Sequence, residues 1–194
     1  MKQFTEVLAL ALSPREGGNS DLLLDEFLRG VKEAGAGIKR LAARELSVRG
    51  CLECGECDET GECIIRDDMD ELYPLLISAK RIVIASPIFF YGLPSEGKAI
   101  IDRTQALWNR IRLNPELKRK DGLGFFIGVG ATRGKNLFEG SSLTIKYFLD
   151  AIGLPMEFSS LTYRRVEAKA AIRDHPTALG DAFAAGKTFV PGKS

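Results

Sequence analysis

Three short runs of apolar residues constrain the fold of this chain more than any other feature. They cover residues 7–12, 82–85 and 123–129, and none of them contains a charged residue. A strand that is apolar on both sides must be buried on both faces, as it is in a parallel sheet with helices on either side. The sequence therefore predicts an α/β fold.

Segments with helical character separate the predicted strands. Their apolar residues recur at the spacing of one helix face. Pro74 fits the second helix only if that helix begins near Asp70, which leaves the proline in the first turn. We expect helices at about residues 20–34, 68–79, 95–113, 138–152 and 177–187.

Two further segments, 38–46 and 156–163, are predicted to be edge strands. Polar residues such as Lys39 and Glu157 interrupt them, so they are less suited to burial on both faces. The strand order 2-1-3-4-5 places both at the edges and puts a topological switch point between the first and third strands. Ligands bind outside the carboxyl ends of the strands at such a point.

Size and composition narrow the class of protein. The 194 residues are 45% hydrophobic and 27% charged, which suits a single globular domain over residues 1–194. A net charge of +1 gives no electrostatic reason to expect nucleic acid or a membrane surface as partner. No apolar run approaches the ~20 residues that span a bilayer, and no signal-peptide cleavage site follows residues 7–12. We therefore expect a cytoplasmic protein.

The loop after the first strand, residues 13–21, has the features of a phosphate site. Its glycines let backbone N–H groups point inward, and it leads into a helix N-terminus, which favours an anion. It is neither a P-loop nor a G-x-G-x-x-G dinucleotide loop. The alternative is an ordinary turn with a helix cap. The predicted binding residues are Ser13, Arg15, Gly17, Asn19, Ser20 and Asp21.

The loops after the third and fourth strands are predicted to complete the same site. Three consecutive aromatic residues in an exposed loop are costly unless they cover something, and a flat aromatic ligand is one such object. A hydrophobic plug or a subunit contact is the alternative. Glycines in the next loop allow close approach to a ligand. The predicted binding residues are Pro87, Ile88, Phe89, Phe90, Tyr91 and Gly92, with Gly130, Ala131, Thr132 and Gly134.

All four cysteines lie in one short segment, as Cys51-x2-Cys54-x2-Cys57-x5-Cys63. In a reducing compartment such clustering indicates metal binding or catalysis rather than a disulfide. Thiolates suit iron–sulfur clusters or zinc, and this compact run can reach the corners of a cubane. Zinc is less natural, since it usually takes two separated pairs. Free or redox-active thiols are the third possibility.

The same segment is acidic and contains no basic residue. Negative charge close to a cluster disfavours the addition of an electron, so the sequence predicts a low reduction potential. The alternative is that the acids only keep the loop soluble. They are Glu53, Glu56, Asp58, Glu59 and Glu62.

With these three loops, nearly the whole chain resembles the flavodoxin-like, NADPH-dependent FMN reductases. The resemblance implies a three-layer sandwich in which residues 13–21 hold the FMN phosphate, while 87–92 and 130–136 border the flavin ring. The cysteine motif is similar to that of the iron–sulfur flavoprotein branch, where it binds a [4Fe-4S] cluster. Lys98 and the Asp102-Arg103 pair resemble family positions of structural rather than catalytic character.

The resemblance also implies partners. The electron donor is expected to be ferredoxin-like or NAD(P)H, the acceptor a small oxidant or quinone-like compound, and the protein a homo-oligomer (dimer or tetramer). No catalytic acid or base is visible in the sequence. Two other functions stay open: an NAD(P)H-dependent FMN or quinone reductase without a cluster, and a non-enzymatic flavin-binding sensor or scaffold with a zinc loop.

Four other polar or aromatic residues invite functional interpretation but have simpler structural ones. His175, the one histidine, is expected to cap the last helix or lie at the surface. Trp108 is expected in the core or at a subunit interface. Asp67 and Asp68 are interpreted as acidic residues at a helix N-terminus, with metal binding as the alternative.

Overall fold

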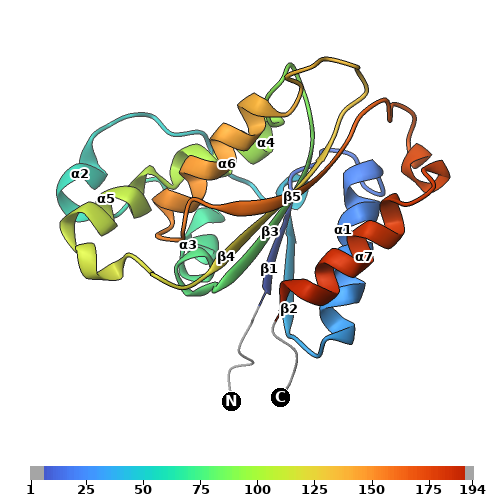
Figure 1. Cartoon of the computed structure of the whole chain (residues 1–194). Coiled ribbons are helices and arrows are strands. Elements are labelled where there is room, and N and C mark those ends of the chain that lie inside the picture. The colour runs from blue at the N-terminus through green and yellow to red at the C-terminus, as the bar shows by residue number, and fades with distance from the viewer. Residues whose placement is uncertain (1–6, 191–194) are drawn as a thin grey trace.

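The computed structural model describes residues 7–190. Its sheet has the predicted parallel arrangement and the predicted order β2-β1-β3-β4-β5. The carboxyl ends of all the strands therefore meet at one edge of the sheet, which is uppermost in Figure 1. The strands are β1 (Val7–Ala11), β2 (Ile38–Ala42), β3 (Arg81–Pro87), β4 (Leu123–Val129) and β5 (Phe158–Tyr163).

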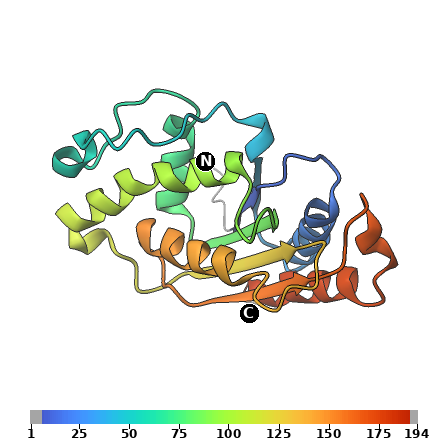
Figure 2. The same ribbon diagram turned by 90° about the horizontal axis from the view of Figure 1, so that it is seen from above.

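Helices cover both faces of the sheet (Figures 1 and 2). The first layer consists of α1 (Asn19–Glu33) and α7 (Ala178–Phe189). The second consists of α3 (Met69–Ser78), α4 (Ser95–Arg103), α5 (Gln105–Leu113) and α6 (Glu139–Ala151). Shorter elements are α2 (Glu56–Thr60) in the cysteine segment and the 3-10 helices Ala43–Glu45, Pro115–Leu117 and Ala171–Asp174.

The central strands supply two separate hydrophobic cores, because successive side chains point to opposite faces of a sheet. In β1, Val7 and Ala9 face α1 and α7, while Leu8 and Leu10 face the other layer. Burial on both sides explains why this strand lacks polar alternation.

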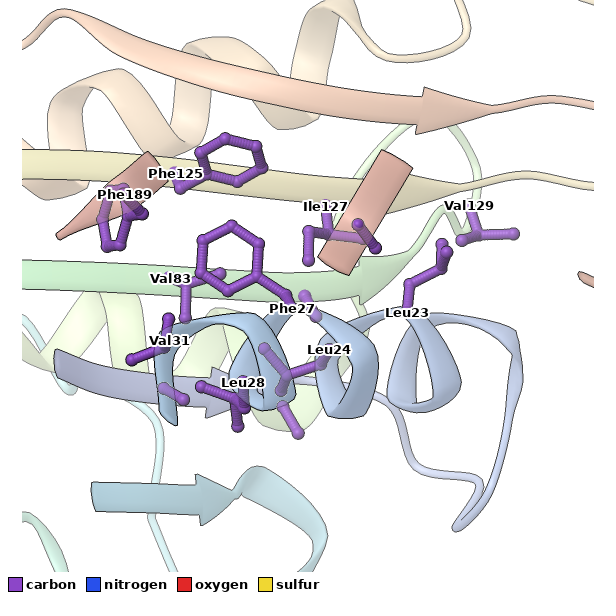
Figure 3. Close-up of a cluster of buried hydrophobic side chains, with 14 of the residues drawn as sticks. Leu23, Leu24, Phe27, Leu28, Val31, Val83, Phe125, Ile127, Val129 and Phe189 are labelled. Carbon is purple, nitrogen blue, oxygen red and sulfur yellow. The ribbon is translucent and has the colours of Figure 1, made fainter. Parts of the chain in front are cut away.

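The core beneath α1 and α7 is centred on three aromatic rings (Figure 3). Phe27 of α1 lies between Phe125 of β4 and Phe189 of α7, with ring centroids 4.7 Å and 5.3 Å away. These tilted and edge-on contacts are the geometries that aromatic pairs prefer. They tie the last helix of the described chain to the middle of the sheet.

Two predicted elements differ from the structure. The predicted single helix over 95–113 is broken at Thr104, whose N–H and hydroxyl both donate to the carbonyl of Ile101. The placement of Pro74 in a first turn is also wrong, because α3 begins at Met69 and the proline lies inside it. Pro74 and Asp70 are both exposed, so water can satisfy the Asp70 carbonyl that loses its helical donor.

The structural roles predicted for His175 and Asp67 are confirmed. The Nδ1 atom of His175 accepts the N–H groups of Thr177 and Ala178 at the start of α7, which is a capping role. Asp67 accepts the N–H of Met69 at the start of α3. Trp108, however, is 42% exposed on α5 and is not part of the core of this chain.

Candidate functional site

A cavity of about 190 Å³ lies at the carboxyl ends of β1, β3 and β4, where the three predicted loops converge. It brings together half of the predicted binding residues. They are Ser13, Arg15, Asn19, Ser20, Pro87, Ile88, Phe89 and Ala131.

One end of this cavity has the chemistry of an anion site. Ser20 is only 2% exposed in the first turn of α1, and its hydroxyl has no hydrogen-bond partner among the described residues. A buried hydroxyl without a partner is costly, and a phosphate oxygen would satisfy it. The exposed Arg15 adds positive charge near the helix N-terminus. The residues present therefore fit the phosphate of a mononucleotide.

Asp21 does not line the cavity, although the sequence placed it in the binding set. Its buried carboxylate accepts the N–H of Gly17 at 3.2 Å and pairs with Arg44 at 3.0 Å. Arg44 also donates to the carbonyl of Ser13. Asp21 and Arg44 thus hold the shape of the loop, and Gly17, with φ of 62°, supplies the left-handed turn that the loop requires.

The loop after β5 contributes two lining residues that sequence analysis missed, Val166 and Glu167. Asn19 ties this loop down: its side chain donates to the carbonyl of Ala168 at 2.9 Å and accepts the N–H of Ile172. The topological rule could have found these residues, because this loop also leaves the carboxyl edge of the sheet.

The aromatic loop forms a tight turn. Phe89 and Gly92 exchange backbone hydrogen bonds of 3.0 Å and 2.9 Å, and Phe90 and Tyr91 between them have φ of 49° and 65°. Left-handed backbone at two consecutive aromatic residues is strained. Phe89 lines the cavity, whereas the side chain of Phe90 points fully into solvent.

Several predicted residues lie beside the cavity rather than in its lining. A Cβ at Gly134 would overlap the hydroxyl of Tyr91, so this glycine lets the aromatic loop pack on the next loop. A Cβ at Gly130 would lie 2.6 Å from Leu137. These two glycines make room for protein contacts. The residues outside the lining are Gly17, Asp21, Phe90, Tyr91, Gly92, Gly130, Thr132 and Gly134.

All four cysteines line a second cavity, of about 640 Å³. All are free thiols; Cys51 and Cys54 are exposed, and Cys57 and Cys63 are half-buried. Within residues 7–190, no three His, Cys, Asp or Glu side chains are gathered closely enough to hold a single metal ion. Four soft thiol ligands around one large cavity nevertheless have the donor chemistry of an iron–sulfur cluster.

The fold of the cysteine segment depends on two glycines. Gly55 and Gly61 flank α2 with φ of 81° and 68°, as expected for a tight wrap. Gly61 also packs directly on α5, since a Cβ there would lie 2.8 Å from the Cα of Arg110. The segment is thus pressed against α5, where Figure 1 shows α2 beside it.

Arginines from α4 and α5 surround this acidic segment. Arg110 pairs with Glu62 at 3.3 Å and donates to the carbonyl of Gly61. Arg112 donates to the carbonyl of Asp58. Arg103, which also lines the cysteine cavity, donates to the carbonyl of Ile65. No basic residue is present within the segment itself, so only the tertiary structure supplies this positive charge.

Burial and hydrogen bonding shift the pKa values of two groups that contact Arg103, namely Asp67 and Tyr73. Burial alone would raise the pKa of Asp67, but hydrogen bonds from Arg103 and from the N–H groups of Arg49 and Met69 outweigh it and lower that pKa. Burial raises the pKa of Tyr73, whose hydroxyl donates to the carbonyl of Arg103. Asp67 is therefore a carboxylate and Tyr73 a neutral phenol at neutral pH.

The family model described as NADPH-dependent FMN reductase matches residues 5–160. An iron-sulfur flavoprotein of Methanocaldococcus jannaschii is 32% identical over 128 residues, covering 66% of this chain and 63% of the relative. Another, from Archaeoglobus fulgidus, is 33% identical over 120 residues, covering 61% and 53%. The match thus spans less than two thirds of the length of these relatives.

Solved structures share the fold. The NAD(P)H:quinone oxidoreductase from Methanothermobacter marburgensis superposes with a TM-score of 0.74 at 17% identity, covering 97% of each chain. Its likeness supports the flavodoxin-like architecture. None of the helices among residues 7–190 is long and apolar enough to cross a bilayer.

Proposed function

Because this chain belongs to the NADPH-dependent FMN reductase family, in its iron–sulfur flavoprotein branch, we propose that it is a redox protein with two centres. FMN would lie in the cavity at β1, β3 and β4, and a [4Fe-4S] cluster would lie among the four cysteines. When bound, the flavin supplies one- and two-electron chemistry and the cluster supplies one-electron chemistry. The observation that carries the proposal is the pairing of an anion site at α1 with a four-thiol cavity in one chain.

The chain's own residues would bind and orient the flavin. The Ser20 hydroxyl and the N–H groups at the start of α1 would donate to the phosphate, and Arg15 would add a screened charge. Phe89 and Ile88 give the cavity an apolar wall against which a flat ring can pack. The other predicted residues of these two loops would shape that wall from behind or from its rim. They are Phe90, Tyr91, Gly92, Gly130, Thr132 and Gly134.

The cysteines would hold the cluster as Cys51, Cys54, Cys57 and Cys63. Helix α4 links the two cavities, because the aromatic loop leads into its start and Asp102 and Arg103 at its end line the cysteine cavity. A helix of nine residues is about 13 Å long. We propose that the cluster and FMN exchange electrons, with transfer between subunits as the route if the two cavities of one chain lie too far apart for fast transfer.

The partners follow from the same chemistry. We expect NAD(P)H or a ferredoxin-like protein as donor, a small oxidant or quinone-like compound as acceptor, and a cytoplasmic homo-oligomer of this single domain. Exposed aromatic side chains suit a subunit interface; they include Trp108 and Tyr147 on the second helical layer and Phe90 in the aromatic loop. Light scattering of the purified protein would test this, and a fully active monomer would rule it out.

The test of the proposal is the composition and absorption spectrum of anaerobically purified protein. We expect flavin bands over a broad iron–sulfur absorption, with iron and acid-labile sulfide near four of each per chain. Absence of FMN affinity would overturn the whole proposal. Stoichiometric FMN without iron would instead favour an NAD(P)H-dependent FMN or quinone reductase, the activity in the family's description. FMN with zinc would favour the sensor or scaffold.

A further inference from the structure

The side chain of Asn109 donates a hydrogen bond to a cysteine sulfur. Its Nδ2 lies 3.2 Å from Sγ of Cys57 and 2.8 Å from Oδ1 of Asp58. Asn109 is 1% exposed on α5, a helix that is distant in sequence from the cysteines. We propose that Asn109 positions the Cys57 thiolate and raises the reduction potential of the cluster, an inference that rests on the proposed function.

The orientation of the Asn109 amide is set by its neighbours. The Nε of Arg112 donates to Oδ1 of Asn109 at 3.2 Å, which leaves the two N–H groups for Cys57 and Asp58. A flipped amide would place an oxygen against the Asp58 carboxylate and an N–H against the Arg112 cation. Charge complementarity therefore holds the donor toward sulfur.

The effect on potential follows from charge. One-electron reduction adds a negative charge to the cluster and its thiolates, while no bond forms and no proton leaves Asn109. An N–H aimed at a thiolate sulfur stabilises the more negative, reduced state and raises the potential. The hydrogen bond from the N–H of Glu53 to Sγ of Cys51, at 3.4 Å, acts in the same sense but is longer.

Burial of Asn109 makes the contact more than an incidental one. A buried amide that lost its partners would be costly, so Asn109, Cys57 and Asp58 form a unit that fixes α2 on α5. Cys57 is thereby held facing the cavity that the other three cysteines also line. Asn109 is a positioning residue and itself binds no metal in this scheme.

The experiment compares Asn109→Leu with Asn114→Leu, the same substitution at an exposed asparagine that follows α5 and whose side chain donates to the carbonyl of Arg110. Each full-length protein is purified anaerobically, and the cluster's midpoint potential is measured by mediated titration followed by electron paramagnetic resonance. We expect a lower midpoint in Asn109→Leu and no shift in Asn114→Leu. Equal midpoints in Asn109→Leu and the wild type would overturn the inference.

The remaining outcomes also support or contradict the role of Asn109. A folded, FMN-binding Asn109→Leu with less iron than Asn114→Leu would support the positioning role. If Asn109→Leu does not fold, Asn109→Ser takes its place, because a serine side chain is too short to reach Cys57. We expect its midpoint potential to be lower than that of the wild type, and an unshifted midpoint would contradict the inference. Wild-type protein without iron would remove the proposed cluster and this inference together, whereas failure of the inference alone appears only in the variants.

Discussion

Arg103 donates a 2.6 Å hydrogen bond to Oδ2 of Asp67, and their side chains are 0% and 7% exposed. This ion pair joins the end of α4 to the segment between the cysteines and α3. Arg103 donates to the carbonyls of Arg49 and Ile65 as well, so one buried cation holds both ends of the cysteine segment.

Removing one partner of this pair should be strongly destabilising. Arg103→Met leaves the Asp67 carboxylate buried and unpaired, which costs about 3–5 kcal/mol of unfolding free energy. Lys98→Met is the matched control, because its 2.6 Å pair with Asp102 is half-exposed and is worth at most about 1 kcal/mol. Urea unfolding measures both; similar losses in the two variants would contradict this reading of Arg103.

Acid should weaken the same contact. The pKa of Asp67 is lower in the folded protein than in the unfolded chain, so the unfolded chain binds more protons as pH falls. The stabilisation is complete above about pH 5, decreases as the unfolded chain protonates around its pKa of about 3.9, and is lost as pH falls through the folded pKa. In urea unfolding, the advantage of the wild type over Asp67→Asn should shrink below about pH 5. An advantage that is constant down to pH 3 would argue against it.

The crossing of α1 and α7 depends on glycine. A Cβ at Gly186 would overlap the carbonyl of Phe27, and one at Gly30 would overlap that of Phe183. We expect Gly186→Ala to cost about 1–3 kcal/mol or more, because the helices must separate. Gly180→Ala, in the same helix with open space around it, should be neutral or stabilising by up to about 1 kcal/mol. Thermal unfolding would separate the two; equal effects would mean that packing is not the cause.

The Ser20 hydroxyl, which finds no hydrogen-bond partner within residues 7–190, should matter for FMN binding and little for folding. Ser20→Ala removes one donor to the phosphate, and a hydrogen bond to a charged group is worth about 1.5–3 kcal/mol, or roughly 10- to 150-fold in Kd. Ser160→Ala, on the exposed face of β5, is the control. Flavin fluorescence quenching gives the affinities, and an unchanged Kd in Ser20→Ala would place the phosphate elsewhere.

Gly61 should affect the cysteine segment without affecting the flavin cavity. Gly61→Ala adds a Cβ at a φ of 68° and 2.8 Å from the Cα of Arg110, so the segment must leave α5. We expect most of the iron to be lost while FMN binding persists. Gly50→Ala has open space and should keep its iron. Metal and flavin analysis of both proteins measures this, and parallel loss of FMN would indicate general unfolding instead.

The strand order was predictable because strands that are buried on both faces consist of apolar residues. Residues 7–12, 82–85 and 123–129 are apolar without interruption, and their strands occupy the middle of the sheet. The break at Thr104 was not predictable in the same way. Apolar residues keep helical spacing through it, and the turn is made by hydrogen bonds to the carbonyl of Ile101.

The candidate sites, too, were predictable only in part. The loop at residues 13–21 was identified from its glycines and position, but half of the predicted binding set does not line the cavity. Asp21 illustrates why: its partner, Arg44, is 23 residues away in sequence and meets it only through the pairing of β1 with β2. Local patterns do not distinguish an acid that faces a ligand from one that holds a loop.

By itself, the sequence determined which segments are buried, which loops leave the carboxyl edge of the sheet, and that all four thiols lie in one short segment. These are local properties, because they follow from the periodicity of apolar residues and from the short spacing of the cysteines along the chain. Only the tertiary structure decided which charges and donors surround those thiols. Asn109, Arg103 and Arg112 come from another helical segment, and their approach to the cysteines depends on how α4 and α5 pack against the sheet, which no short-range pattern records.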